Sequence, residues 1–161
     1  MTEEWNLNKL KETYKVFQRK YELPLFEKIN EDFQIEKAAE CETDFILREV
    51  REIITNKFLN YLRFIESILN PSNSPMFMFA IVKTLGTKEK EKLSELYKKI
   101  AKIEIDLIEL DLEYSEKKEA EAIKKYYEVW QNIKKDFMGI VDVIKKNWDT
   151  KIEENGKGYF G

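Results

Sequence analysis

Apolar residues recur three and four positions apart through two long stretches between Thr87 and Trp148. This spacing places them on one face of an α-helix, so it predicts two long amphipathic helices packed as a hairpin. The first stretch carries Leu93, Leu96, Ile100, Ile103, Leu107, Leu110 and Tyr114, and the second carries Ile123, Tyr126, Trp130, Ile133, Phe137, Ile140 and Ile144. Such helices would be rods of about 40 to 50 Å, and rods of that length need other helices to cover them.

The N-terminal part of the chain shows the same periodicity. It predicts a helix from Asn6, as N-cap, to about Glu22, and a short second helix after Pro24, because proline is tolerated only in the first turn of a helix. A longer helix is predicted from Thr43, or from a few residues earlier. It ends before Pro71, since a residue that precedes proline is pushed out of the helical region.

A short apolar segment follows this proline. Ser74 is the predicted N-cap, and Gly86 is the predicted C-terminal cap of this helix. Seven consecutive apolar residues, 76–82, cannot all face inward on so short a helix. We interpret them either as buried within one chain or as an interaction surface, whose candidate residues are Met76, Phe77, Met78 and Phe79. Thr87 and Ser115 are the predicted N-caps of the two long helices.

These elements predict an all-α fold, an elongated up-down helical bundle of about four long helices plus one or two short helices. The length of 161 residues fits a single domain over 1–150, followed by a flexible polar C-terminal tail at 151–161. One pattern competes with this interpretation. The segments 103–107 and 110–114 alternate between apolar and polar residues, as an exposed-face strand would, but nothing else in the chain alternates to pair with them, so the helix is kept.

Several charges interrupt the apolar faces. Successive residues lie about 100° apart around a helix, and this places Glu104 and Asp111 inside the apolar arc of the first long C-terminal helix. Lys57, with Arg51 nearer the edge, and Lys134 lie among apolar residues in the same way. Burying any one alone is costly, so we expect ion pairs across helix interfaces; a polar site for a metal or a small ligand is the alternative.

Composition excludes several kinds of chemistry. The chain has no histidine, which removes histidine general bases, ferritin-like di-iron sites and zinc fingers. Its single cysteine, Cys41, lies among acidic residues and is not a candidate nucleophile. No Gly-rich phosphate loop is present, and we expect no cofactor. Glu49 and Glu52, and likewise Glu113, Glu116 and Glu119, are interpreted as solvated faces.

Charge and hydropathy indicate which partners and which compartment to expect. The net charge is −3, with 28 basic and 31 acidic residues interspersed, and Lys117, Lys124, Lys135 and Lys146 share their helix side with acidic residues, so nucleic-acid binding is disfavoured. The lone cysteine, the acidic start and the lack of a long apolar run predict a cytoplasmic protein without a membrane span. The enrichment in Lys, Glu and Ile is typical of thermophilic proteins, although AT-rich genomes give the same bias.

The sequence therefore favours a non-enzymatic helical interaction or scaffold protein that self-associates through an apolar surface around 76–82. The alternative is an enzyme or carrier with a polar ligand or metal site between helices, built from Glu104, Asp111, Lys57 and Lys134 with Arg51 nearby. Nucleic-acid binding is the third hypothesis. The first predicts homo-oligomers, or another protein as partner, and no membrane.

Overall fold

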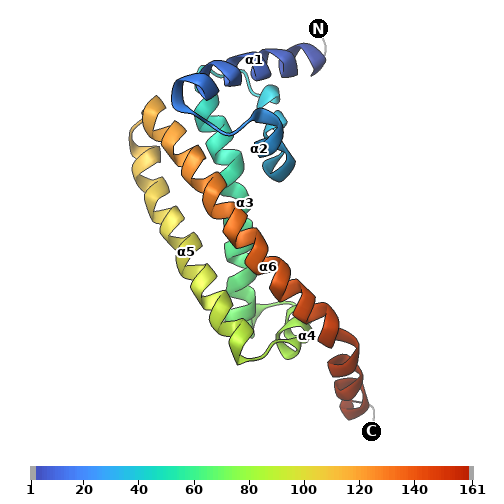
Figure 1. The fold of residues 1–161 in the computed structure, drawn as a ribbon. Helices are drawn as coiled ribbons and strands as arrows, with labels where there is room; N and C mark the ends of the chain where they lie inside the picture. The colour runs from blue at the N-terminus through green and yellow to red at the C-terminus, as the bar shows by residue number, and fades with distance from the viewer. Residues whose placement is uncertain (1–2, 160–161) are drawn as a thin grey trace. The chain divides into compact units, whose positions relative to one another are not determined.

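The computed structural model describes the backbone of residues 3–159 and the side chains of residues 6–150. Within that range the chain is helical and contains no strand, which confirms the predicted all-α helical bundle (Figure 1). The elements are α1 (Glu3–Tyr21), α2 (Phe26–Phe33), the 3-10 helix η1 (Ile35–Glu40), α3 (Ile46–Leu69), the 3-10 helix η2 (Pro71–Asn73), α4 (Met76–Thr84), α5 (Thr87–Leu112) and α6 (Glu116–Tyr159).

The chain divides into two compact units. Unit 1 comprises Met1–Leu59 and Ile103–Trp130, and unit 2 comprises Asn60–Lys102 and Gln131–Gly161. Helices α3, α5 and α6 each contribute residues to both units. The single domain over 1–150 stays a prediction, and the polar tail at 151–161 lies outside the residues whose side chains are described.

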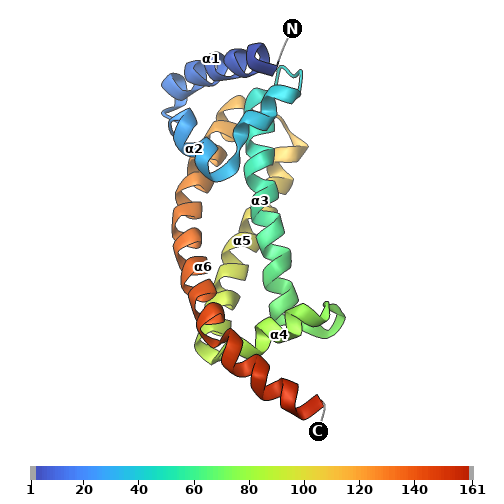
Figure 2. The ribbon, with the colours of Figure 1, turned by 90° about the vertical axis from the view of Figure 1, so that its right-hand side faces the viewer.

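In unit 1, α1 packs against η1 and α2 (Figure 2). Pro24 breaks the chain between α1 and α2 as predicted, and the Tyr14 hydroxyl donates a hydrogen bond of 2.8 Å to its carbonyl oxygen. Three apolar residues of α2 are buried, Phe26, Ile29 and Phe33. Its last residue, Phe33, contacts the rings of Phe58 and Trp130, with centroid distances of 6.4 and 5.6 Å. An aromatic core therefore holds α2 against α3 and α6.

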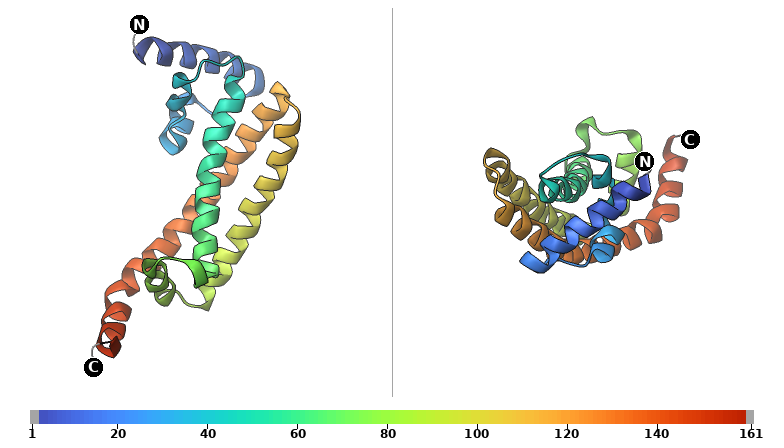
Figure 3. Two further views of the ribbon diagram at one scale, coloured as in Figure 1. Left: turned by 180° about the vertical axis from the view of Figure 1, so that it is seen from behind. Right: turned by 90° about the horizontal axis from the view of Figure 1, so that it is seen from above.

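In unit 2, α4 lies beside the later part of α6 (Figure 3). The Asn147 amide donates a hydrogen bond of 3.0 Å to the carbonyl oxygen of Thr84, the last residue of α4. This bond satisfies a C-terminal helix carbonyl that has no partner within α4. The end of α3 is joined to α6 by the rings of Tyr61 and Phe137, whose centroids are 4.8 Å apart.

Four of the predicted helix caps are wrong. Asn6 lies inside α1, which begins at Glu3, and Thr87 is the first residue of α5 rather than the residue before it. Pro75, rather than Ser74, is the N-cap of α4. Gly86 belongs to the start of α5, because its carbonyl accepts the bond from Lys90 and its N–H donates to Glu89 Oε2 at 2.9 Å.

The predicted cap at Ser115 is confirmed. Its side-chain oxygen accepts a hydrogen bond of 3.3 Å from the N–H of Lys118, and its carbonyl accepts one of 2.9 Å from the N–H of Glu119. The hydroxyl therefore satisfies a first-turn N–H of α6 that has no partner within the helix. This cap sets the start of α6 and with it the position of Glu119 in the first turn.

The alternating segments lie in α5 as far as its last residue, Leu112, so the helix interpretation is confirmed there. Leu107 and Leu110 are buried, whereas Ile105, Ile108 and Leu112 are 67%, 62% and 83% exposed. The helix therefore has two apolar faces on opposite sides. Their residues alternate with polar ones along the sequence, and this produces the strand-like pattern.

Candidate functional site

Helix α4 presents a group of apolar side chains to solvent. Met76 is 84% exposed, Phe77 is 60% exposed and Phe79 is 41% exposed; we name these three residues the α4 surface. The Phe77 ring lies against Trp148 of α6, with ring centroids 5.9 Å apart. Methionine and phenylalanine adapt to a partner and are enriched in the centres of protein interfaces.

The opposite face of α4 anchors this surface. Met78 and Ile81 are buried, and the Thr84 hydroxyl is buried and donates to the carbonyl of Ile81 at 2.6 Å. Met78 was one of the residues predicted for the interaction surface, and this prediction is wrong. It points inward because Met78 lies three residues before the buried Ile81, on the same side of α4.

The charged residues predicted to face inward fall into different environments. Arg51 is 2% exposed and donates from Nη2 to Asp111 Oδ1 at 2.8 Å, while Asp111 itself is 61% exposed. Burial opposes the charge on Arg51, but its hydrogen bonds to Glu119 and Asp111 outweigh this effect and raise the pKa of the guanidinium above its ordinary value. The pair joins α3 to the end of α5, across a helix interface.

Glu104, Asp111 and Lys134 are exposed, so the prediction that they face the core is wrong. Each follows a buried residue, Ile103, Leu110 or Ile133, on a helix whose buried residues are spaced alternately three and four positions apart. Buried residues with this spacing form a narrow stripe that shifts slowly around a helix of 3.6 residues per turn. A residue that directly follows a buried one in the sequence therefore lies outside the stripe. A polar site built from all the predicted residues is therefore not supported within either unit.

Lys57 is half-buried in unit 1. Its ammonium donates a hydrogen bond to the carbonyl oxygen of Asp32 and lies 4.8 Å from the centre of the Trp130 ring and 5.5 Å from that of Phe33. A carbonyl and two aromatic faces stabilise a cation that α3 holds close to the core. These contacts occupy the amine in a structural role.

Glu119 is the buried charge that the sequence interpretation missed, because it was interpreted as part of a solvated face. It is fully buried, and its carboxylate accepts from Arg51 Nε at 2.7 Å, from Arg51 Nη2 at 3.2 Å and from Arg48 Nε at 3.2 Å. Its position four residues before Ile123 places it on the buried face of α6, and extending that apolar stripe one turn toward the N-terminus would have found it. Glu113 is exposed, and Glu116 accepts hydrogen bonds of 2.6 Å from both Lys20 and Tyr21.

Arg48 completes this cluster. Its Nη2 donates to the carbonyl oxygen of Leu110 at 3.1 Å, and its guanidinium lies 5.0 Å from the centre of the Tyr114 ring. The carbonyl belongs to the last turn of α5, where helix carbonyls have no partner within the helix. Arg48 and Arg51 therefore fix the turn between α5 and α6 against α3, and two carboxylates balance their two charges. We name Arg48, Arg51, Asp111 and Glu119 the ionic cluster.

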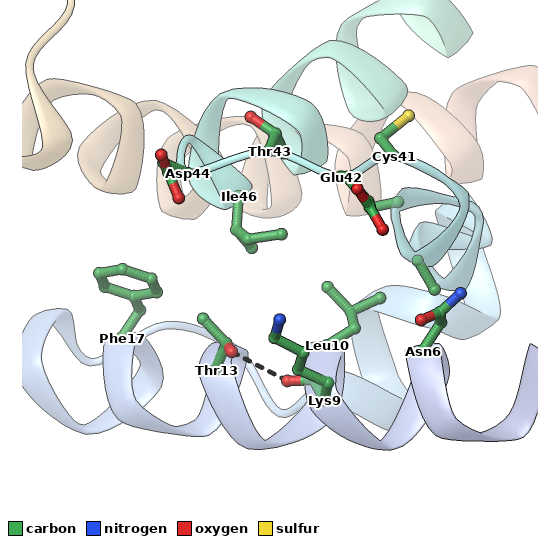
Figure 4. Close-up of a pocket in the computed structure, with 12 residues that line it drawn as sticks. Asn6, Lys9, Leu10, Thr13, Phe17, Cys41, Glu42, Thr43, Asp44 and Ile46 are labelled. Atoms are coloured by element: carbon green, nitrogen blue, oxygen red, sulfur yellow. Dashed lines mark hydrogen bonds between the residues drawn. The ribbon is translucent and has the colours of Figure 1, made fainter. Parts of the chain in front are cut away.

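Unit 1 also holds a cavity of about 570 Å³ between α1 and the segment that leads into α3 (Figure 4). Lys9 and Thr13 line it from α1, and Glu42 and Asp44 line it from the other side. Desolvation and the Glu49 carboxylate raise the pKa of the neighbouring Cys41 thiol, so the reactive thiolate is disfavoured. Lys9, Glu42 and Asp44 are all exposed, so their charges do not require a ligand.

No protein family, no curated protein and no solved structure matches this chain. In the range that the structure describes, no group of three or more Cys, Asp or Glu side chains is placed to hold a metal ion. No helix among the described residues combines the length and the apolar character needed to cross a membrane.

Proposed function

We propose that this chain is a helical interaction protein that self-associates through the α4 surface. The observation that carries the proposal is the exposure of Met76, Phe77 and Phe79 on a helix whose other face is firmly anchored. Contiguous exposed apolar side chains are typical of contact sites in soluble proteins. The anchored face keeps the three side chains in a fixed arrangement, which lowers the entropy lost when a partner binds.

A second copy of the chain is the partner that the local charge favours. Lys83 is the only charged residue of α4, so two copies could bring their α4 surfaces together with little like-charge repulsion. A two-fold dimer places the same patch on both sides of the interface, and an apolar patch is complementary to itself. Phe77 and Trp148 would supply the aromatic anchors that dominate the energy of many interfaces.

Sedimentation velocity over a range of concentrations tests the proposal. We expect the wild-type chain to form a concentration-dependent dimer. The double variant Met76→Ser, Phe77→Ser should have a dimer dissociation constant at least roughly tenfold higher, because apolar contact area is lost. Val16→Ser is the matched control, since Val16 is 63% exposed on α1 of unit 1, and it should dimerise as wild type does. A wild-type chain that stays monomeric at all concentrations, or a double variant that dimerises normally, overturns the proposal.

A further inference from the structure

The outward face of α5 in unit 1 carries a line of apolar side chains. Ile105, Ile108 and Leu112 are spaced three and four residues apart, so they lie along one line on the helix; we name them the outer α5 stripe. This line is on the side opposite Leu107 and Leu110, which are buried. Single exposed apolar residues are ordinary on protein surfaces, but this spacing is the one through which a second helix packs.

Acidic residues border the outer α5 stripe on both edges. Helical geometry places Glu104 and Asp111 along one edge and Glu109 along the other. Asp111 pairs with Arg51, and Glu109 pairs with Lys118 at 3.0 Å, yet these two side chains remain 61% and 75% exposed. Their outer oxygens can therefore accept further hydrogen bonds from a partner.

The acidic edges disfavour a second copy of α5 as the occupant. In an antiparallel pair, the same edges of the two helices meet, and Glu104 of one copy would lie near Asp111 of the other. In a parallel pair, opposite edges meet, and Glu104 would lie near Glu109. Both arrangements bring carboxylates together, and like charges at the edges of a helix pair select against it.

We propose that the outer α5 stripe binds an amphipathic helix of a different protein, with apolar residues at three-four spacing and Lys or Arg beside them. This inference goes beyond self-association through the α4 surface and uses different residues. The apolar residues of the partner would cover Ile105, Ile108 and Leu112, and its cations would meet Glu104, Glu109 and Asp111. The chain would then link its own copies to a basic helical partner.

A pair of synthetic helical peptides tests this inference on the full chain. Both carry leucine at three-four spacing; one has lysine at the flanking positions and the other has glutamate. By isothermal titration calorimetry, we expect the lysine peptide to bind at least roughly tenfold more tightly than the glutamate peptide, and less tightly as salt is raised. The double variant Ile105→Ser, Ile108→Ser should weaken that binding by roughly tenfold or more, while Val16→Ser should leave it unchanged.

A charge-reversal variant gives an independent measurement. The double variant Glu104→Lys, Glu109→Lys should reverse the preference and favour the glutamate peptide, and it keeps the apolar stripe intact. Both substituted sites are exposed, so the far-ultraviolet circular dichroism should match wild type. Equal binding of the two peptides, no binding of either, or binding that survives the Ile105→Ser, Ile108→Ser change overturns the inference. So does a wild-type dimer that the same isoleucine changes abolish.

Discussion

Arg51 and Glu119 in unit 1 are charged side chains that are almost completely buried, whereas Met76 and Phe77 in unit 2 are apolar side chains that are mostly exposed. Both placements are unfavourable when a residue is considered alone. In the ionic cluster, every charge meets at least one opposite charge of the same chain, and Arg48 also donates to a helix-end carbonyl. At the α4 surface, the described contact of Phe77 with Trp148 leaves the Phe77 ring more than half exposed.

The two regions differ in whether their unfavourable groups are already satisfied within the fold. A buried group whose hydrogen-bonding capacity is used within the fold has little left for a ligand. An exposed apolar group on an anchored helix can still gain free energy by being buried against a partner. We therefore assign the ionic cluster to stability and propose the α4 surface as a binding site. This contrast can be tested by measuring how each region responds to substitution.

Arg51→Met should have the largest effect. It removes the main partner of a carboxylate that stays fully buried, and breaking a buried pair in this way costs about 3–5 kcal/mol of unfolding free energy. Urea denaturation followed by circular dichroism measures the loss. The double variant Arg51→Met, Glu119→Leu removes both buried charges and should recover at least half of it. A double variant as unstable as Arg51→Met would contradict a structural role for the pair.

The pH dependence of stability provides the second test of unit 1. Burial, assisted by Asp106, raises the pKa of Tyr126 from 10.0 to about 12. The unfolded chain therefore loses this proton first, so the contribution of Tyr126 is fully present below pH 10 and falls by about 3 kcal/mol as the pH rises toward 12. Urea denaturation across this range should show a shallower decline for Tyr126→Phe than for wild type. Equal declines would show that the hydroxyl is not desolvated.

Two methionines two residues apart on α4 give a matched comparison in unit 2. Met78 is 8% exposed and Met76 is 84% exposed. Met78→Ala should cost about 2–4 kcal/mol, because it leaves a cavity in the core, whereas Met76→Ala should change stability by less than about 0.5 kcal/mol. Chemical denaturation at concentrations where the chain is monomeric separates folding from association. Equal losses at the two sites would contradict the assignment of α4 to one buried and one binding face.

Sequence periodicity predicted most of the helices because long amphipathic helices repeat a pattern many times over. The 3-10 helix at 35–40 was not predicted, since it is too short for a repeat to establish itself. Among the charges, Arg51 was recognised because apolar residues, Leu47 and Ile54, lie one helical turn before and after it. Glu104 and Lys134 were misplaced because the predicted apolar arc was wider than the buried stripe, and a position at the edge of a stripe needs the partner helix to decide its environment.

Glu119 shows a different limit of prediction from sequence. A carboxylate in the first turn of a helix is favoured by the helix dipole in water, so an exposed acidic residue and a buried one look alike in sequence at this position. What distinguishes them is the pair of guanidinium groups that α3 brings to Glu119 from about seventy residues away in the chain. A single helix carries no information about such a partner.

Asp111→Asn should have a small effect and tests whether burial ranks the members of the ionic cluster. Asp111 and Glu119 both accept hydrogen bonds from Arg51, but the first side chain is 61% exposed and the second is fully buried. Water screens the exposed pair, so its loss should cost no more than about 1 kcal/mol, against several for Arg51→Met. Added salt should narrow the difference between wild type and Asp111→Asn while leaving the larger loss in Arg51→Met. A loss of several kcal/mol in Asp111→Asn would mean that burial does not rank the members of the ionic cluster.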